Sequence, residues 1–260
     1  MSQKDLDFCQ KLADLADEIS MARFGALDLV IETKPDLTPV SDADKKVEEE
    51  LRKLILEYSP TDSIIGEEFG VDGESNREWI LDPIDGTKNF VRGGPFWGTL
   101  IGLRIDNKMQ VGMVSAPALG RRWFGAIGHG SYLRTNTNNF KKERKLQVSK
   151  VSRIEDAYFG YSSQERWAKR NQEENFEKLL KKVWRARGFG DFIIHMMVAE
   201  GSIDFSMEPK LALWDMAALE IIVKEAGGKF SNLSGVAGID GPGAISSNGV
   251  LHNEIVNRFN

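Results

Sequence analysis

The hydrophobic positions near the start of the chain follow the spacing of a helix. Apolar residues recur every three or four positions, at Leu6, Cys9, Leu12, Ala16 and Ile19. A second stripe of the same period contains Val47, Leu51, Leu54, Ile55 and Tyr58. Each pattern predicts an amphipathic helix with one buried face. Ser41 stands at the N-cap position of the second helix and Asp44 follows three residues later, as in a weaker capping box.

In the middle of the chain, the hydrophobic positions repeat at a shorter spacing than that of a helix. Its apolar stretches are separated by Gly, Pro and Asn turns and predict strands at 63–66, 79–82, 96–105, 109–116 and 122–126. Because the links between them are short, we expect an antiparallel sheet. Two further segments are polar. The segment 32–41 contains two prolines and is expected to be rich in turns, and the basic segment 134–144 is expected to be an exposed loop.

Strands and helices alternate in the second half. The pattern predicts helices at 164–182, 191–200, 214–226 and 250–259, with strands at 184–187, 203–207, 229–231 and 244–247. Such alternation indicates layered α/β packing. The chain is therefore expected to be one domain over 1–260, with an antiparallel N-terminal lobe at about 1–140 and a smaller mixed α/β lobe at about 141–260.

Composition excludes several classes of protein. The 260 residues are 41% hydrophobic and 28% charged, as in an ordinary folded protein, and the net charge of −5 lacks the basic surplus of a general nucleic-acid binder. The single cysteine, Cys9, excludes an intrachain disulfide and a multi-cysteine zinc site. Charges interrupt every apolar run that would be needed for a signal peptide or a membrane span. We expect a cytoplasmic protein with no nucleic-acid or membrane partner.

The hexapeptide DPIDGT at 82–87 contains the densest group of candidate functional residues in the sequence. A predicted strand runs into Asp82 and Asp85, while Pro83 fixes one φ angle and Gly86 permits an unusual turn. Such a turn can aim both carboxylates at one point and free a carbonyl between them, which is the ligand set that Mg²⁺ prefers. If a helix starts there, the amides of Gly86 and Thr87 could hold an anion. The alternative is an ordinary acidic turn.

Other acids strengthen the metal hypothesis. Glu67 and Glu68 end a predicted strand, and Asp215 lies in the first turn of an apolar helix, near the positive end of its dipole. The alternative for Asp215 is a helix cap, and the same alternative applies to Asp44 at the start of the second predicted helix.

These segments resemble the signature motifs of the inositol monophosphatase superfamily. The matching segments are Glu67-Glu68, the DPIDGT hexapeptide and Trp214-Asp215-Met216-Ala217-Ala218, in the family order. The segment 34–44 is similar to the family's N-terminal lysine–aspartate motif, and 225–228 matches the stretch after the last motif. The resemblance covers nearly the whole chain. It implies a layered αβαβα sandwich that is usually dimeric, so we expect a homodimer.

The resemblance also implies roles for the acids. Glu67, Asp82 and the carbonyl of Ile84 would bind a first Mg²⁺, Asp82, Asp85 and Asp215 would bind a second, and Glu67 would contact a weaker third ion. Two divalent ions neutralise phosphate charge, lower the pKa of an attacking water and stabilise the leaving alkoxide. We therefore expect two or three Mg²⁺ ions in each site and a phosphate ester as substrate.

The remaining catalytic roles follow from the same resemblance. Thr87 and Asp44 would orient and deprotonate the attacking water, with assistance from Glu67, and the amides of Gly86 and Thr87 would hold the phosphate. In-line attack by water needs no covalent enzyme intermediate. A nucleophilic Ser or Cys is therefore not required.

One segment bears on the substrate. The RGFGD sequence at 187–191 resembles that of bacterial histidinol-phosphate phosphatases of this superfamily, whereas inositol-type members usually carry a small neutral residue at the position of Asp191. Glu208 matches a substrate-contacting glutamate of the family. The resemblance implies that Arg187, Asp191, Glu208 and Asp215 contact the substrate. Carboxylates would form charge-assisted hydrogen bonds with the ammonium and imidazole of histidinol. The alternative for Asp191 is an N-cap.

Two other functions stay open at this point. A broad inositol-1-phosphatase would use the same metal motif, and a non-catalytic regulator that binds RNA polymerase or RNA would keep the fold. Every expected ligand position is filled, which favours an active enzyme. The three histidines, His129, His195 and His252, lack metal spacing, and Trp97, Trp123, Trp184 and Trp214 are expected in the core.

Overall fold

A computed structural model describes residues 3–137 and 140–259. Its larger sheet has eight strands in the order β10-β9-β8-β7-β6-β5-β3-β4. The strands are β3 (Ser63–Gly66), β4 (Gly70–Asp72), β5 (Arg77–Asp85), β6 (Gly98–Ile105), β7 (Lys108–Ala116), β8 (Arg121–Ala126), β9 (Gly130–Thr137) and β10 (Phe140–Lys145). Neighbours are antiparallel except β3 and β5, which are parallel. The parallel pair places Gly66, the last residue of β3, beside Leu81, which precedes Asp82 in β5.

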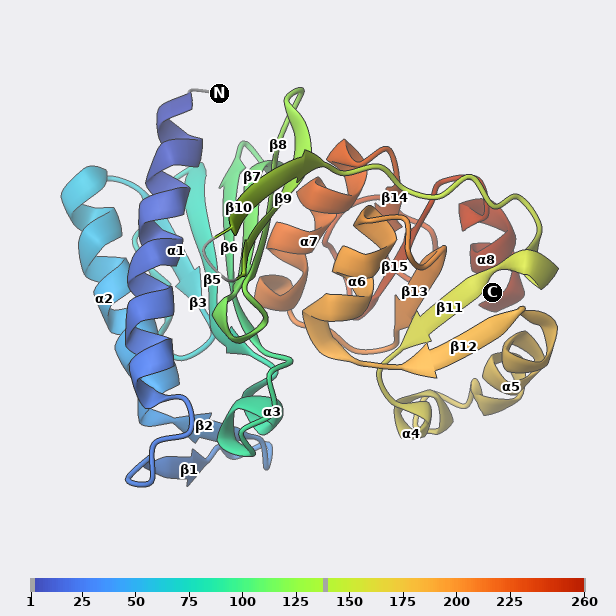
Figure 1. The fold of residues 1–260 in the computed structure, drawn as a ribbon, viewed down its shortest axis with the longest axis horizontal. Helices are drawn as coiled ribbons and strands as arrows, with labels where there is room; N and C mark the ends of the chain where they lie inside the picture. The colour runs from blue at the N-terminus through green and yellow to red at the C-terminus, as the bar shows by residue number, and fades with distance from the viewer. Residues whose placement is uncertain (1–2, 138–139, 260) are drawn as a thin grey trace.

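Two long helices cover one face of this sheet. These are α1 (Gln3–Arg23) and α2 (Asp42–Tyr58) (Figure 1). The predicted apolar stripes are buried here, for example at Leu12 and Leu51, against sheet residues such as Trp79. Ser41 caps α2, with the side chain of Asp44 completing a capping box as predicted. The cap fixes Asp44 at the buried start of α2.

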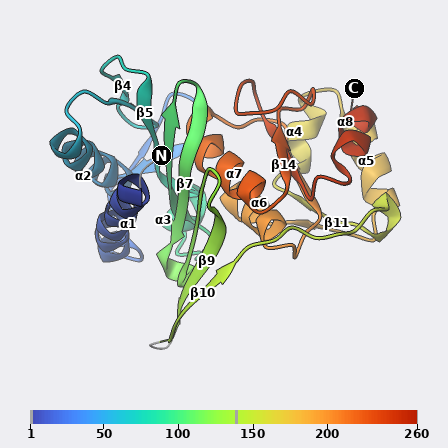
Figure 2. The ribbon, with the colours of Figure 1, turned by 90° about the horizontal axis from the view of Figure 1, so that it is seen from above.

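Two other helices, α6 (Asp191–Ala199) and α7 (Leu213–Glu225), lie on the opposite face (Figure 2). α7 lies unusually close to the sheet because β6 and β7 carry glycines where it crosses them. A Cβ at Gly112 would come within 2.4 Å of the carbonyl oxygen of Ala218, and one at Gly102 within 2.9 Å of the Ala217 Cβ. This close approach brings the first turn of α7 to the end of β5.

The smaller sheet has five strands in the order β12-β11-β13-β15-β14. They are β11 (Tyr158–Tyr161), β12 (Arg185–Gly188), β13 (Phe205–Glu208), β14 (Lys229–Ser231) and β15 (Ala244–Ser247). Both neighbours of β11 are parallel to it and the remaining pairs are antiparallel, so the sheet is mixed as predicted. Its outer face is covered by α4 (Gln164–Ala168), α5 (Glu173–Lys182) and α8 (His252–Phe259).

Five layers therefore follow one another across the molecule (Figure 1). The order is α1/α2, the larger sheet, α6/α7, the smaller sheet, and the outer helices of the second half. The expected αβαβα sandwich is confirmed. None of the helices in the described ranges is long and apolar enough to cross a membrane.

The prediction of a loop at 134–144 is wrong for the residues that the structure describes, although residues 142–144 are exposed as expected, and residues 138–139 lie outside the described ranges. Strands β9 and β10 form an antiparallel hairpin there, with Arg134 opposite Glu143 and an ion pair of 2.9 Å between them. β10 is the edge strand of the sheet, so its pattern shows none of the apolar alternation of a buried strand. The larger sheet extends to Lys145, beyond the expected boundary near residue 140. The division into two lobes stays a prediction.

Other differences are local. The predicted helix at 164–182 is broken into α4 and α5, and Asn171 between them has a φ of 58°. The predicted turn-rich segment contains a small hairpin of β1 (Ile31–Thr33) and β2 (Pro39–Ser41). Sequence patterns also missed β4, β11 and α3 (Thr87–Val91), with two 3₁₀ turns at Pro117–Leu119 and Ile154–Asp156. Trp184 is 67% exposed rather than in the core.

Candidate metal and phosphate site

Three aspartates gather where β5 ends and α7 begins. Carboxylate oxygens of Asp82, Asp85 and Asp215 lie within 4.8 Å of one another. The pairing of β5 with β6 is irregular between Asp82 and Asp85. Asp215 is the third residue of α7, and one of its oxygens also accepts a hydrogen bond from the Ala212 amide at 2.8 Å. Asp215 is therefore both a helix-capping residue and a member of the cluster.

The turn after Asp85 depends on Gly86. This residue has a φ of 81°, in the left-handed region that favours glycine, and a Cβ there would come within 2.7 Å of the Phe96 carbonyl oxygen. Gly86 is the N-cap of α3, so a helix does start at Thr87. The chain thus passes from strand to helix within two residues, with the amides of Gly86 and Thr87 at the turn.

Burial and mutual repulsion make the ionised form of these three carboxylates unfavourable. Asp82 is only 1% exposed, and its Oδ1 has no hydrogen-bond partner among the described residues. Burial raises the pKa of Asp82 and of Asp85 well above its usual value, and neighbouring carboxylates raise both further. Burial is also the main reason that the pKa of Asp215 rises to about 6. Buried oxygens that repel one another fit a hard divalent cation.

Glu67 is not one of the three clustered acids. It follows β3, and its carboxylate accepts a hydrogen bond from Lys34 Nζ at 2.7 Å, while the same ammonium donates to Glu68 at 2.6 Å. Glu67 is nevertheless the neighbouring charge that most raises the pKa of Asp82. In this state, Lys34 is the cation that partners Glu67. The lysine–aspartate motif of the sequence included Lys34, but its spacing did not indicate this contact.

The structure brings Thr87 and Asp44 together. The Thr87 hydroxyl lies 3.2 Å from Asp44 Oδ1 and 3.0 Å from the Ile84 carbonyl oxygen, so one hydrogen is shared between two acceptors. The other Asp44 oxygen accepts hydrogen bonds from the amide and hydroxyl of Ser41. Burial raises the pKa of Asp44, although the bonds from Ser41 and Thr87 oppose the rise. Asp44 is therefore a cap residue that also faces the acidic turn.

Asp191 lies against the same turn. Its carboxylate is 3.4 Å from the position that a Cβ of Gly86 would take, and it accepts a hydrogen bond from Asn89 Nδ2 at 3.2 Å. The next amide, that of Phe192, donates to Asp85 Oδ2 at 2.7 Å. The N-cap of α6 is Gly190, so Asp191 is not the N-cap that the alternative interpretation expected.

Glu208 ends β13 and is buried. Its Oε2 accepts hydrogen bonds from Ser162 at 2.6 Å and from Arg166 at 3.4 Å, while its Oε1 has no partner among the described residues. Burial raises the pKa of Glu208 to about 8, and the nearby Asp191 contributes to the rise. Sequence spacing gave no signal for Ser162 or Arg166, which are more than forty residues from Glu208.

Arg187 is placed differently from the other predicted substrate residues. It is exposed on β12, and its guanidinium donates to the carbonyl of Ala186 at 2.8 Å. His195, in contrast, is buried, with Nδ1 2.8 Å from the Ser246 hydroxyl, and burial lowers its pKa to about 3. A neutral, buried histidine of this kind is a packing residue.

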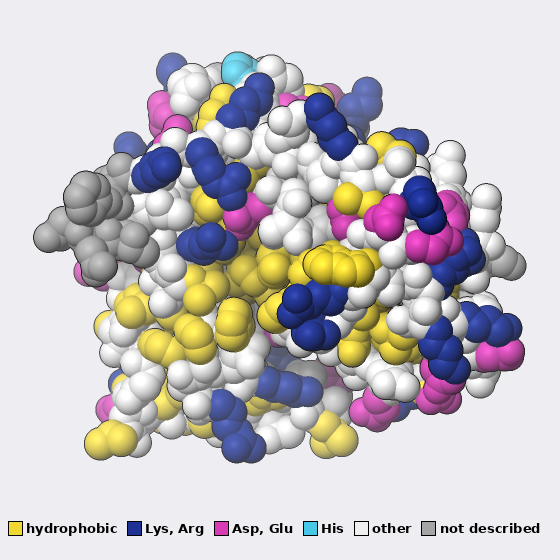
Figure 3. Space-filling model, turned by 45° about the vertical axis from the view of Figure 1, so that its right-hand side comes forward, with side chains coloured by type: hydrophobic (Ala, Val, Ile, Leu, Met, Phe, Trp, Pro, Cys, Tyr) yellow, Lys and Arg dark blue, Asp and Glu magenta, His cyan; other side chains and the backbone are white. Residues whose placement is uncertain are grey.

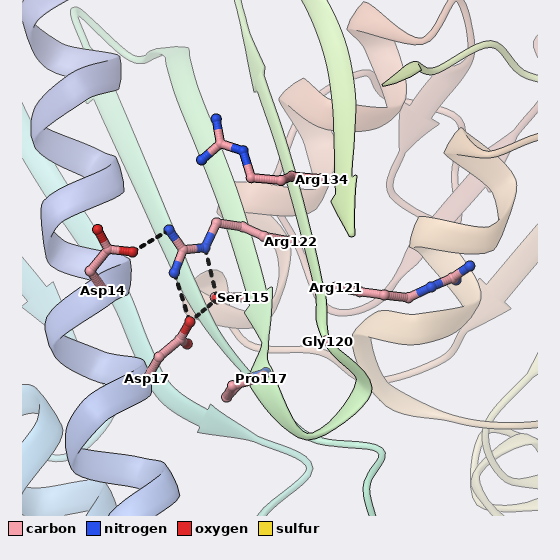
Figure 4. A pocket seen from close by; sticks show the side chains of 8 residues that line it. All are labelled: Asp14, Asp17, Ser115, Pro117, Gly120, Arg121, Arg122 and Arg134. Carbon is pink, nitrogen blue, oxygen red and sulfur yellow. Dashed lines mark hydrogen bonds and ion pairs between the residues drawn. The ribbon is translucent and has the colours of Figure 1, made fainter. Parts of the chain in front are cut away.

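A polar cavity lies away from the aspartate cluster, on the α1 face of the larger sheet (Figure 4). Its volume is about 190 Å³, and Arg122 at its centre donates to Asp14 and Asp17 at 2.7 Å and to Ser115 at 3.0 Å. Arg122 thus forms ion pairs with both acids, while the buried Oδ1 of Asp17 has no hydrogen-bond partner among the described residues. On the face of the molecule shown in Figure 3, basic side chains are scattered among acidic, apolar and uncharged ones. The described side chains on that face do not form the continuous basic patch that is typical of a nucleic-acid binder.

Comparisons with known proteins extend over the whole fold. The model of the inositol monophosphatase family matches residues 2–260. A histidinol-phosphatase of Mycobacterium tuberculosis is 48% identical over 100% of this chain and 99% of its own. One of Streptomyces coelicolor is 50% identical over 98% and 97%. The solved structure of a Thermotoga maritima IMPase superposes with a TM-score of 0.86, at 29% identity and coverage of 99% and 97%.

Proposed function

The chain belongs to the inositol monophosphatase family, and from this premise we propose that it is a magnesium-dependent histidinol-phosphatase. The reaction would be hydrolysis of L-histidinol phosphate to L-histidinol and phosphate, a step of histidine biosynthesis. The observation that carries the substrate assignment is a pair of carboxylates beside the clustered aspartates, the buried Glu208 and the half-buried Asp191. The similarity to two relatives named histidinol-phosphatase supports it.

The clustered aspartates support the proposed metal site. Asp82, Asp85 and Asp215 would hold Mg²⁺, together with the Ile84 carbonyl and Glu67, in two or three sites. When bound, the ions would neutralise phosphate charge and lower the pKa of water. Binding through Glu67 requires that its carboxylate exchange the Lys34 ammonium for the ion. The free Oδ1 of Asp82 needs no such exchange.

Thr87 and Asp44 would prepare the attacking water. When the Thr87 hydroxyl donates its hydrogen to Asp44, its lone pairs are left to accept a hydrogen bond from water and so orient it. The raised pKa of Asp44 makes it a better proton acceptor than an ordinary aspartate. The amides of Gly86 and Thr87 would hold phosphate oxygens, and the missing side chain of Gly86 lets the phosphate approach the backbone.

The far end of the substrate would meet Asp191 and Glu208. Histidinol carries a primary ammonium and an imidazole, which donate hydrogen bonds to carboxylates. Glu208 Oε1 is buried without a partner among the described residues, so a donor from the substrate would relieve its unpaired state. Neutral inositol cannot supply an ion pair there. Arg187 faces solvent and is proposed to contribute only where the substrate reaches the surface.

A phosphate-release panel tests the proposal. Histidinol phosphate, inositol 1-phosphate and glycerol 2-phosphate would be compared with Mg²⁺ and with a chelator. We expect Mg²⁺-dependent release with kcat/KM highest for histidinol phosphate. A preference for inositol 1-phosphate would identify the broad inositol-type enzyme instead, and no release from any ester would favour the non-catalytic regulator.

The homodimer and the cytoplasmic location remain part of the proposal. Light scattering after size exclusion should give about twice the protomer mass of 29.1 kDa. A mass equal to the protomer would contradict the dimer.

A further inference from the structure

The substrate-facing carboxylate of Asp191 is held in an unfavourable setting. Its backbone φ is 54°, in the left-handed region that non-glycine residues rarely adopt. Asp85 and Asp215 repel it from within the metal cluster, and the buried carboxyl of Glu208 lies near it. Arg166 and Lys88 are the cations that attract it. Without a direct partner, such a side chain would turn toward those cations and away from the turn.

Asn89 supplies that direct partner. Its side-chain amide has two hydrogens, and the structure gives each an acceptor: the Phe96 carbonyl at 2.8 Å and Asp191 Oδ2 at 3.2 Å. Phe96 is a backbone acceptor next to Trp97, which is fully buried, so its position is fixed. The first bond therefore sets the orientation of the amide, and the second hydrogen points at Asp191.

Asn89 also belongs to the element that begins at the phosphate-binding turn. It lies on α3 two residues after Thr87, and its backbone amide donates to the Gly86 carbonyl at 2.8 Å. One short helix thus fixes both the turn that would hold the phosphate and the donor that holds Asp191. The distance between the two ends of the bound substrate is set through this helix.

We propose that Asn89 is a positioning residue that holds the Asp191 carboxylate over Gly86 and so selects phosphate esters with a cationic group at a set distance from the phosphate. This inference rests on the proposed function, because Asp191 is the group that would contact the cation. Asn89 itself does not contact the substrate in this arrangement.

A double-mutant cycle tests the inference. Asn89→Ala, Asp191→Gly and the double variant would be compared on histidinol phosphate and on glycerol 2-phosphate, which has no cation. Glycine is chosen because it tolerates the left-handed backbone. We expect Asn89→Ala to raise KM for histidinol phosphate about fivefold, as the loss of one hydrogen bond implies, with kcat nearly unchanged. KM for glycerol 2-phosphate should stay the same.

The cycle separates positioning from a merely structural role. In the Asp191→Gly background, Asn89→Ala should have no further effect on histidinol phosphate, because nothing remains to be positioned. An equal loss in both backgrounds, or on both substrates, would show that Asn89 only anchors α3 to Phe96 and would overturn the inference. Asn76→Ala is the matched control: it removes a bond of 2.7 Å from an exposed Asn amide to Asp106 and should leave both KM values unchanged.

A crystal structure of Asn89→Ala gives a readout that does not depend on the substrate. The Asp191 carboxylate should have left its position over Gly86, and an unchanged carboxylate would overturn the inference. The wild-type protein tests the proposed function separately: if it shows no preference for histidinol phosphate over glycerol 2-phosphate, the substrate assignment fails. The crystal structure would still decide the role of Asn89.

Discussion

At the scale of single residues, the site is built from carboxylates whose burial works against folding. Asp82 illustrates this, because it is almost fully buried, lies close to Asp85 and Asp215, and has one oxygen with no hydrogen-bond partner in the described part of the chain. Buried like charges destabilise a fold unless an ion or a proton neutralises them. Replacement of such residues should separate stability from activity.

The substitution Asp82→Asn should lower activity and raise stability. The variant should lose turnover, because the carboxylate shared by both proposed ions is gone. Its melting temperature in a chelator should rise by about 2–4 °C for each kcal/mol of repulsion removed. Phosphate release and thermal melts with and without Mg²⁺ check both effects. Full activity of the variant, or of the wild type in a chelator, would sink the metal assignment.

Substitutions of Asp191 can distinguish the effect of its charge from the effect of its backbone strain. Asparagine tolerates a φ of 54° and removes only the charge, so Asp191→Asn should raise KM for histidinol phosphate by about ten- to a hundredfold. Glycine also relieves the backbone, so Asp191→Gly should lose the same selectivity and melt higher by a few degrees, from about 1 kcal/mol of strain. Alanine is a poorer probe because it would keep the strain.

These Asp191 variants would be measured by kcat/KM on charged and neutral esters and by thermal melts. Equal losses on histidinol phosphate and glycerol 2-phosphate would mean that Asp191 holds the loop rather than the substrate. The histidinol assignment would then rest on similarity to relatives alone.

At the scale of elements, the site depends on where helices begin. Asp44 lies in the first turn of α2 and Asp215 in the first turn of α7, while α3 begins with Thr87 and α6 with Asp191. Four helix starts thus surround the end of β5. Helix N-termini stabilise negative charge. This arrangement therefore lowers the free-energy cost of placing several carboxylates, and the proposed phosphate, close together.

The pair formed by α2 and α3 gives a kinetic prediction. Thr87→Ala and Asp44→Asn should each lower kcat by about 10²–10⁴-fold, the range of general acid–base catalysis, with a smaller change in KM. The double variant should be little worse than either single one, because the two residues act as one unit. Steady-state kinetics of the three variants decide this. Losses that multiply would mean that Asp44 serves only as the cap seen with Ser41.

At the scale of the whole molecule, the buried ionisable groups make stability depend on pH. Burial raises the pKa of Glu208 to about 8, above its unfolded value near 4.5, so the folded state binds its proton more tightly and stability falls as pH rises between these values. Burial lowers the pKa of His195 to about 3, so its effect has the opposite sign and acts only below about pH 6.5.

Between pH 6.5 and 8, the pH dependence of stability comes from the buried carboxyl groups, and His195 no longer contributes to it. In the metal-free protein we expect the free energy of unfolding to fall by about 2 kcal/mol across this range from Glu208 alone. Glu208→Gln should flatten the fall, and Mg²⁺ should oppose it by binding the ionised cluster. Urea unfolding at several pH values, in a chelator, measures the slope. A stability that rises over this range in the wild type would contradict the burial of a protonated Glu208.

The sequence by itself determined the elements whose signals are local. Residues close together in the sequence predict the apolar stripes of α1 and α2, the cap at Ser41 and the DPIDGT turn. They also predict the bounds of β3, β14 and β15. Edge strands were missed because β10 faces solvent and has no buried pattern to show. The break between α4 and α5 was missed because the helical period continues through it.

Only the tertiary structure decided which side chains meet. Asn89 and Asp191 are 102 residues apart, Lys34 and Glu67 are 33 apart, and Ser162 and Glu208 are 46 apart. A hydrogen bond depends on distance and direction in space, and the order of residues along the chain fixes neither across separate elements. Glu67 shows the consequence: its residue type suits a metal ligand, while in the packed fold its carboxylate forms an ion pair with Lys34.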